Sequence, residues 1–377
     1  MKRIYLDNAA TTPIDSDIIK MMNEIMKVNF GNPSSAHSYG REARTIIEDS
    51  RKVIADLLHT SPGSIFFTSG GTEANNMAIK RSIYDKNIKH AITSKIAHPA
   101  VLAPLQELSD RGLINLSYVE IDNKGRISLS DLRRKLNSFP SSFVSIMHAN
   151  NEIGTIQDIK KIGIICREFN SIFHSDTVQT VGHYNFNMQE LDVDFITASA
   201  HKFHGPKGVG FIYLSDNVNI NPFLLGGSQE RNMRAGTENI HSIAGLAMAM
   251  KIAYKNLEED TKYIKKLKSY MIERLKSEIS DIAFYANCTD LSNSLYTVLS
   301  VNFPKNEISE MLLFNLDIMG ICCSGGSACS SGGVKGSYVF SSILPDSERP
   351  GIRFSFSKYN TIDDIDYTIK VLKDLFS

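Results

Sequence analysis

Strand-like and helix-like segments alternate between residues 65 and 214, and this alternation restricts the fold more than any other feature of the chain. Short apolar segments typical of strands are separated by longer segments with helical periodicity. Such an order predicts a mostly parallel sheet covered by helices on both faces. The predicted strands are 65–68, 90–93, 116–119, 143–148, 172–176, 194–198 and 209–214, and the predicted helices between them include 73–83, 129–136 and 158–169.

The flanking segments predict a second, smaller domain. Helical patterns cover residues 15–28 and 41–58, and a long helical stretch over 242–279 leads away from the sheet region. Beyond it, strands at 295–303 and 352–356 and a last helix from Thr361 follow in a less regular order, which is typical of an α+β domain. We expect a large domain at 15–255, and a small domain built from 1–14 and 256–377 in which the N-terminal arm returns to join the C-terminal part.

The charge balance and the cysteines narrow the functional classes. Lys+Arg and Asp+Glu both number 41 in 377 residues, so no bulk attraction to nucleic acid or to an anionic membrane is expected. No apolar run approaches the ~18 residues of a membrane span, and the first residues lack the pattern of a signal peptide. The five cysteines, with Cys322 and Cys323 adjacent, do not form a disulfide framework. We therefore expect a cytoplasmic protein with no direct nucleic-acid or membrane partner.

Lys202 stands at the end of one predicted strand, just before a tight turn. Ser199, His201 and His204 surround it in the sequence, and Gly205-Pro206 forms the turn. A lysine at a strand end usually just extends its ammonium group to water. A partly desolvated lysine instead loses its proton more easily, and its neutral amine can form a Schiff base with a carbonyl cofactor. The sequence therefore predicts that Lys202 holds pyridoxal 5'-phosphate (PLP).

Two further strand ends carry groups suited to such a cofactor. Residues 69–73 (Ser-Gly-Gly-Thr-Glu) join a strand to a helix, where backbone N–H groups bind anions, so they predict a phosphate site. The alternative is a simple turn with Thr72 as the helix N-cap. Asp176 can pair with a pyridine nitrogen, and Gln179 can donate a hydrogen bond to a phenolic oxygen. The alternative for Asp176 is that it caps the following helix.

Three more residues have both a functional and a structural interpretation. His98 can stack on a pyridine ring and relay protons, or it can be a structural loop residue before Pro99. Asn151 can hold a substrate carboxylate or the phenolic oxygen, although paired asparagines also form turns. Arg353 lies inside an otherwise apolar strand, where its planar fork suits a carboxylate ligand or an internal salt bridge.

A second unusual stretch is the segment 324–333, which is almost entirely glycine and serine and has Cys329 at its centre. Such a composition cannot build a core, so we expect a mobile loop that presents the thiol. An exposed free cysteine is a liability without a use, so Cys329 is interpreted as a nucleophile or a metal ligand. Cys322 and Cys323 lie in an apolar run and are interpreted as packing residues.

In this order and spacing, these residues resemble cysteine desulfurases of the nitrogen-fixation and iron–sulfur-cluster type, a class V branch of the fold type I (aspartate-aminotransferase-like) PLP enzymes. The resemblance extends over nearly the whole chain, and the extended loop around Cys329 resembles the long-loop group I. Thr177 departs from the pattern, because family members usually have alanine or glycine there. The segments that carry the resemblance are 5–12, 30–35, 68–73, 150–154, 201–202, 234–237 and 327–329.

The resemblance implies a role for each matching residue and an expected fold, with a mostly parallel seven-stranded sheet in the large domain beside the smaller α+β domain. No metal is expected. The implied catalytic residues are Lys202, which would carry the cofactor, His98 and Cys329. The implied cofactor-binding residues are Gly71, Thr72, Asn151, Asp176, Gln179, Ser199, His201 and Thr237, the last of them contributed by the partner subunit of a homodimer. The implied substrate-binding residues are Asn8, Asn151 and Arg353.

The implied activity converts L-cysteine to L-alanine and leaves the sulfur as a persulfide on Cys329. The sulfur would then pass to an acceptor protein, such as a cluster scaffold or a sulfur carrier. A selenocysteine lyase or a class V aminotransferase on the same fold is the alternative. From another class, a non-catalytic metal or cluster carrier would use Cys322, Cys323 and Cys329, although this spacing lacks a C-x-x-C pair.

Overall fold

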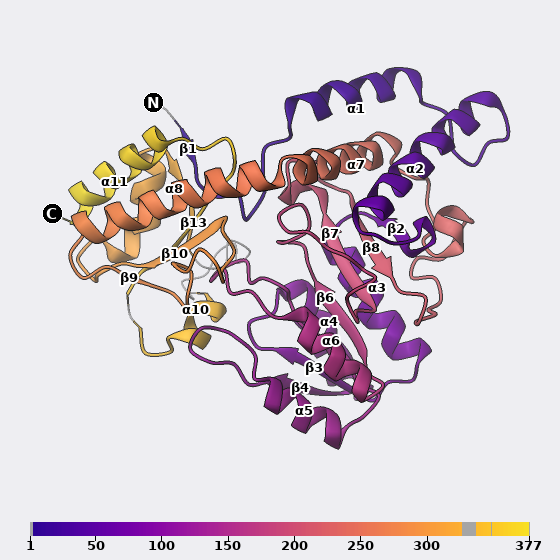
Figure 1. Cartoon of the computed structure of the whole chain (residues 1–377), viewed down its shortest axis with the longest axis horizontal. Helices are drawn as coiled ribbons and strands as arrows, with labels where there is room; N and C mark the ends of the chain where they lie inside the picture. Colours follow the sequence, from indigo (N-terminus) through magenta and orange to yellow (C-terminus); the bar gives the residue numbers. More distant parts are fainter. Residues whose placement is uncertain (1–2, 326–336, 348, 377) are drawn as a thin grey trace.

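The computed structural model describes residues 3–325, 337–347 and 349–376. Its largest sheet has seven strands and lies in the lower right of Figure 1. β8 runs antiparallel to both of its neighbours, and all the other strands run in one direction, which confirms the predicted mostly parallel sheet. In spatial order the strands are β2 (Ile65–Thr68), β8 (Gly210–Leu214), β7 (Phe195–Ser199), β6 (Ile172–Asp176), β5 (Phe143–Ser145), β3 (His90–Ser94) and β4 (Asn115–Val119).

Helices cover both faces of this sheet because successive strand residues point to opposite sides. Phe195 packs into a cluster with residues of α3 (Gly71–Asp85), whereas Ile196 packs into the cluster that contains residues of α2 (Ser38–Leu57) and α7 (Ile240–Lys255). On the α3 side lies also α4 (Pro99–Asp110), and on the α2 side lie α5 (Leu129–Ser138), α6 (Ile159–Glu168) and α1 (Ser16–Val28). The continuous apolar strands of the sequence are therefore buried on both faces.

A second core lies at the other end of the molecule. It combines α8 (Leu257–Glu278) and α11 (Ile362–Phe376) with an antiparallel sheet. The N-terminal arm lies against this core, because Ile4 and Tyr5 pair in parallel register with Ile321 and Cys322 (Figure 1). The domain boundaries at residues 14/15 and 255/256 stay a prediction. The remaining elements are β1 (Ile4–Tyr5), β9 (Ala283–Phe284), β10 (Val298–Asn302), α9 (Leu312–Ile318), β11 (Ile321–Cys322), β12 (Ser324–Gly325), α10 (Tyr338–Ile343) and β13 (Gly351–Ser355).

The expected helical stretch over 242–279 consists of two consecutive helices that meet at Asn256. The Asn256 N–H donates to the Ile252 carbonyl and closes α7, and the Asn256 carbonyl accepts from the Asp260 N–H and opens α8. Glu258, Glu259 and Asp260 in the first turn of α8 are typical of a helix start and mark the break in the sequence. Among the described residues, no helix is both long enough and apolar enough to cross a membrane.

Candidate active site

A cavity of about 330 Å³ opens where the parallel strands β6 and β7 end. Ligands of open α/β sheets bind at the carboxyl ends of the strands, so its position is the expected one. Its size is that of an ordinary small-molecule site. Among its lining residues are most of those predicted from the sequence: Gly71, Thr72, His98, Asn151, Asp176, Gln179, Ser199, His201, Lys202 and Arg353.

Lys202 follows β7 directly, in a single turn of 3₁₀ helix over Ala200–Lys202. Its ammonium group does not simply extend to water. The Nζ atom donates to the carbonyl oxygens of Ala9 at 2.6 Å and Ala10 at 2.9 Å. The side-chain amide of Gln179 donates to the same Ala9 oxygen at 3.0 Å. The N-terminal arm therefore fixes the amine at the wall of the cavity.

Asp176 is held at the end of β6 with its carboxylate almost fully buried. Its Oδ2 accepts from the Asn75 side-chain amide at 2.8 Å, and its Oδ1 accepts from the Val178 N–H at 3.1 Å. Asn75 in turn accepts from the Thr197 hydroxyl at 2.8 Å, which fixes the orientation of its amide. The carboxylate therefore has a fixed direction at the cavity wall and keeps lone pairs for a further donor.

His98 has a structural role and also lines the cavity. Its Nδ1 accepts from the Ala100 N–H at 3.1 Å and so caps α4, which begins at Pro99. This leaves the ring proton of a neutral His98 on Nε2. Burial lowers the pKa of His98, Asp176 raises it and Lys202 lowers it further. Both interpretations of His98 are therefore compatible with its position, and ring stacking stays a prediction.

The N-terminus of α3 offers backbone donors to an anion. Its N-cap is Gly70, at φ 151°, and no side chain caps the helix, so the alternative in which Thr72 is the N-cap is wrong. The Glu73 carboxylate accepts from the Ser69 N–H just before the helix and from Arg234. His201 also lines the cavity. Burial lowers its pKa to about 4, and the positive charges of Lys202 and Lys207 lower it in the same direction, so its ring is neutral at pH 7.

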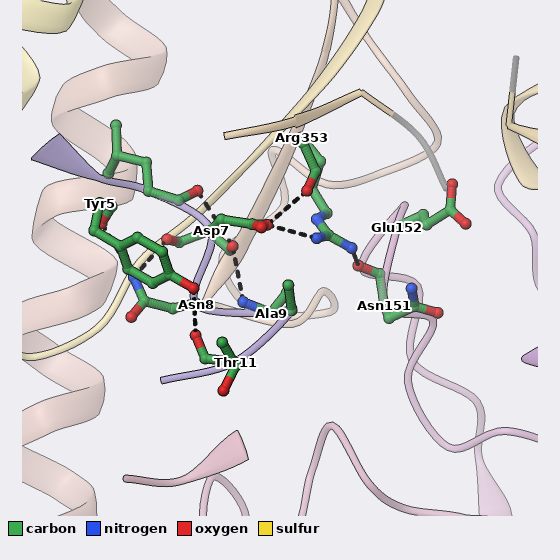
Figure 2. A network of polar contacts seen from close by, with 12 residues as sticks. Tyr5, Asp7, Asn8, Ala9, Thr11, Asn151, Glu152 and Arg353 are labelled. Atoms are coloured by element: carbon green, nitrogen blue, oxygen red, sulfur yellow. Dashed lines mark hydrogen bonds and ion pairs between the residues drawn. The ribbon is translucent and has the colours of Figure 1, made fainter. Parts of the chain in front are cut away.

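Arg353 joins three distant segments at the cavity (Figure 2). It is 3% exposed and lies on β13. One terminal nitrogen donates to Asp7 Oδ1 at 2.7 Å and the other to the Asn151 carbonyl at 3.0 Å. Asp7 also accepts from the Ser324 hydroxyl at 2.8 Å. The guanidinium therefore makes an internal salt bridge and also lines the cavity, so the two interpretations made from the sequence are not exclusive.

Among the described residues, this cavity is not lined by Asn8, Thr177 or Thr237. The Asn8 amide donates to the Ser355 carbonyl at 2.9 Å and to Asn360 Oδ1 at 3.1 Å. Thr237 lines a separate cavity of about 220 Å³. The Thr177 hydroxyl donates to the Thr197 carbonyl at 2.8 Å, inside the sheet. Cys329 lies outside the described residues. The functional roles of Asn8, Thr237 and Cys329 stay predictions.

Cys322 and Cys323 are not disulfide-bonded, and burial raises the pKa of the Cys323 thiol. Among the described residues, no group of three or more His, Cys, Asp or Glu side chains is placed to hold a metal ion. Cys323 is therefore a protonated packing residue at neutral pH.

Asn75, Glu152 and Asp7 were not among the site residues predicted from the sequence. Asn75 gave a usable signal, because it lies four residues after Gly71 and so shares its helix face. Glu152 lines the cavity and accepts from the Ser337 hydroxyl. Asp7 binds Arg353 from 346 residues away. The contacts of Glu152 and Asp7 join segments far apart in the sequence, so no local sequence pattern predicts them.

The residues present fit pyridoxal phosphate. The cavity combines an amine on Lys202, a buried and oriented carboxylate on Asp176, and an uncapped helix N-terminus beside Ser199. These three groups match the aldehyde, the pyridine nitrogen and the phosphate of the cofactor. Because Gly71 has no side chain, the start of α3 can lie close to Val178. A Cβ atom at position 71 would lie only 2.6 Å from Val178 Cγ2.

Comparison with known proteins gives a family. The family model for aminotransferase class-V matches residues 4–368. The chain is 43% identical to the cysteine desulfurase IscS of Dictyoglomus turgidum, over 99% of this chain and 94% of that one. A solved structure of a NifS-like protein superposes with a TM-score of 0.89 at 36% identity, covering 99% of both chains. A structure of SspA in complex with cysteine superposes with a TM-score of 0.80 at 29% identity, covering 95% of this chain and all of that one.

The match of the family model over almost the entire sequence confirms the resemblance inferred from the motifs, and the superposition with the NifS-like structure confirms the predicted fold. The site residues and the family match point to the same cofactor. The chain belongs to the aminotransferase class-V family of PLP-dependent enzymes and, within it, to the cysteine desulfurases.

Proposed function

We propose that this enzyme converts L-cysteine to L-alanine and transfers the sulfur atom to Cys329, as a sulfur source for iron–sulfur cluster assembly. The observation that carries the proposal is the single cavity shared by the amine of Lys202, the buried carboxylate of Asp176 and the guanidinium of Arg353. An amino-acid substrate needs all three groups in one place. The Lys202 amine transfers the Cα proton, Asp176 supports the electron-withdrawing cofactor, and Arg353 binds the substrate carboxylate. The relative named SspA, which was solved with cysteine, supports this choice of substrate.

When bound, pyridoxal phosphate withdraws electrons from the substrate amino acid and so makes its Cα proton acidic. The buried carboxylate of Asp176 would hold the pyridine nitrogen in its protonated form. Lys202 is placed to move the proton, because its neutral amine accepts the proton from Cα at Nζ. The carbonyl oxygens of Ala9 and Ala10, which accept from Nζ, then stabilise the resulting ammonium group.

Arg353 and Asn151 orient the substrate. The Arg353 guanidinium is fixed by Asp7 and by the Asn151 carbonyl, so it needs no rearrangement to bind a carboxylate. Its Nε finds no hydrogen-bond partner among the described residues, although it is buried. A substrate carboxylate at this edge of the cavity would accept hydrogen bonds from the Arg353 guanidinium.

Cys329 completes the transfer. Its thiolate attacks the substrate sulfur, the bond between that sulfur and Cβ breaks, and Cβ takes up a proton. The products are L-alanine and a persulfide on Cys329, so atoms and electrons balance without an external oxidant. An acceptor protein then receives the outer sulfur atom.

The test is a visible spectrum of the purified enzyme before and after L-cysteine, with alanine and sulfide measured in the same sample. We expect a cofactor band that changes on addition, alanine as product, and sulfide when a reducing thiol is present. Cys329→Ala should keep the cofactor band and release no sulfide, and Lys202→Ala should lose the band. Sulfide release by Cys329→Ala at the wild-type rate, or a keto acid as the main product, would reject the proposal.

We infer a homodimer in which Thr237 of a second copy completes the phosphate site, as the resemblance to the family implies; in its own chain Thr237 lines a separate cavity. A cytoplasmic location fits the proposed role in cluster assembly. Sedimentation of the holoenzyme should give twice the chain mass, and Thr237→Ala should weaken cofactor binding without dissociating the dimer.

A further inference from the structure

His183 lies behind Lys202, on the side away from the substrate cavity. It follows Gly182, a residue at φ 82° in the segment after β6. Its Nε2 lies 3.1 Å from the Lys202 carbonyl oxygen, and its Nδ1 lies 3.1 Å from the Tyr296 hydroxyl. His183 does not line the 330 Å³ cavity, but it lines a narrow space of about 30 Å³ that Lys202 and Tyr296 also border. His183 therefore touches the main chain of the lysine and not the reacting groups.

The two hydrogen bonds determine which nitrogen carries the proton. A carbonyl oxygen only accepts, so Nε2 must donate to Lys202. In the neutral ring Nδ1 is then an acceptor, and the Tyr296 hydroxyl donates to it. Burial lowers the pKa of His183, although its bond to the Lys202 carbonyl opposes this shift, so the neutral ring is favoured at pH 7. The result is a directed chain from Tyr296 through His183 to Lys202.

Tyr296 belongs to the C-terminal core. It is 2% exposed and packs among the residues of that core, and its ring meets the His183 ring edge-on at a centroid distance of 5.8 Å. Lys202, by contrast, follows a strand of the large sheet. The hydrogen-bonded chain therefore connects the main chain of the lysine to the second core.

We propose that His183 is a positioning residue that holds the Lys202 peptide in register with the C-terminal core through Tyr296. The reach and direction of Nζ depend on where the Lys202 main chain lies, because the side chain has fixed bond lengths and preferred rotamers. An error of about 1 Å in the place of a reacting group is enough to slow a reaction strongly. The inference relies on the proposed function only for the role it gives Lys202.

The first test compares three holoenzymes by pH titration of the cofactor absorbance, without L-cysteine: wild type, His183→Leu and His183→Gln. The band would report the protonation state of the Lys202 nitrogen in the holoenzyme, and this state depends on the groups beside which that nitrogen is held. We expect His183→Leu to move the midpoint by at least about 0.5 unit. Glutamine keeps a donor near the place of Nε2, so His183→Gln should return the midpoint to within about 0.2 unit of wild type.

The matched control is His148→Leu. His148 is another histidine of the large domain: its Nδ1 lies 3.0 Å from the Thr180 hydroxyl, and its ring packs edge-on against Tyr184 and Phe186. The loss of this ring should lower stability and leave the titration midpoint unchanged. An equal shift in His148→Leu and His183→Leu would show a general loss of packing and would overturn the proposal, as would a wild-type midpoint in His183→Leu.

The second test uses kinetics and the tyrosine. The loss of one net hydrogen bond corresponds to about a tenfold rate effect, so His183→Leu should lower kcat about tenfold and leave KM for L-cysteine within about twofold. Tyr296→Phe should give a smaller loss in the same direction. The double variant should be no slower than His183→Leu, because both changes break one chain. Additive losses would contradict the chain, whereas a wild-type enzyme that makes no alanine would contradict the proposed function alone.

Discussion

At the residue scale, Arg353 illustrates how a buried charge is prepared for a ligand. Its partners Asp7, in the N-terminal arm, and Asn151, in the segment between β5 and α6, keep the planar guanidinium in place before any substrate arrives (Figure 2). The removal of one partner from a buried ion pair leaves an uncompensated charge and is strongly destabilising. The ion pair with Asp7 therefore compensates the buried charge of Arg353 in the strand, and the same guanidinium lines the cavity.

Arg353→Lys tests whether the fork is needed. Lysine keeps the positive charge but loses the bidentate geometry, so KM for L-cysteine should rise about 10- to 100-fold, while the cofactor band stays at its wild-type position. Steady-state kinetics and the absorbance spectrum of the same preparation measure the two effects. The matched control is Arg349→Lys, which changes an arginine that does not line the cavity. A KM within twofold of wild type in Arg353→Lys would remove Arg353 from carboxylate binding.

At the scale of elements, the end of the cavity proposed to bind the phosphate depends on how closely β7, β8 and the turn before α3 approach one another. Gly210 on β8 is the point of contact. A Cβ atom there would press on the Ala198 carbonyl oxygen and would lie 2.8 Å from Gly70 Cα. Both neighbours are backbone atoms, so no rotamer change relieves the clash.

Gly210→Ala should therefore displace the turn at Gly70. We expect a loss of about 1–3 kcal/mol in the free energy of unfolding and at least a tenfold weaker cofactor affinity. Urea denaturation and absorbance titration with pyridoxal phosphate measure these quantities. Gly63→Ala is the control, because its new methyl group would meet only the Ser61 hydroxyl at 3.2 Å. Equal cofactor affinities of the two variants would show that the approach at Gly210 does not shape the site.

At the scale of the whole molecule, neutral histidines are built into the large sheet. His174 is fully buried on β6, its Nδ1 lies 2.8 Å from the Ser145 hydroxyl, and burial lowers its pKa to about 4 in spite of the nearby Asp176. The unfolded chain takes up the proton near pH 6.5, before the folded chain does. The stability contributed by the neutral ring is thus complete above pH 6.5 and is lost progressively as the pH falls toward 4.

His174→Gln should make the stability of the protein less dependent on pH. Between pH 7 and pH 5 the wild type should lose on the order of 2 kcal/mol more unfolding free energy than the variant, because glutamine has no proton to gain. Urea denaturation at the two pH values measures the difference. Identical losses in both proteins would mean that His174 is not protonated on unfolding in this range.

The sequence by itself was sufficient for the sheet and for most of the cavity wall. Apolar strands that alternate with helices favour a mostly parallel sheet with both faces buried, and this places the carboxyl ends of the parallel strands at one edge. Asp176, Ser199 and Lys202 could therefore be grouped from their positions after predicted strands. The motifs added the identity of the cofactor.

Only the tertiary structure decided the contacts between distant segments. The carbonyl oxygens of Ala9 and Ala10 that hold Lys202, the pairing of Asp7 with Arg353 and the inward turn of Asn8 all involve the N-terminal arm. Periodicity reports the environment of a residue along its own element. It does not report which segment from the other end of the chain will provide that environment, because that partner is selected by the packing of the two cores.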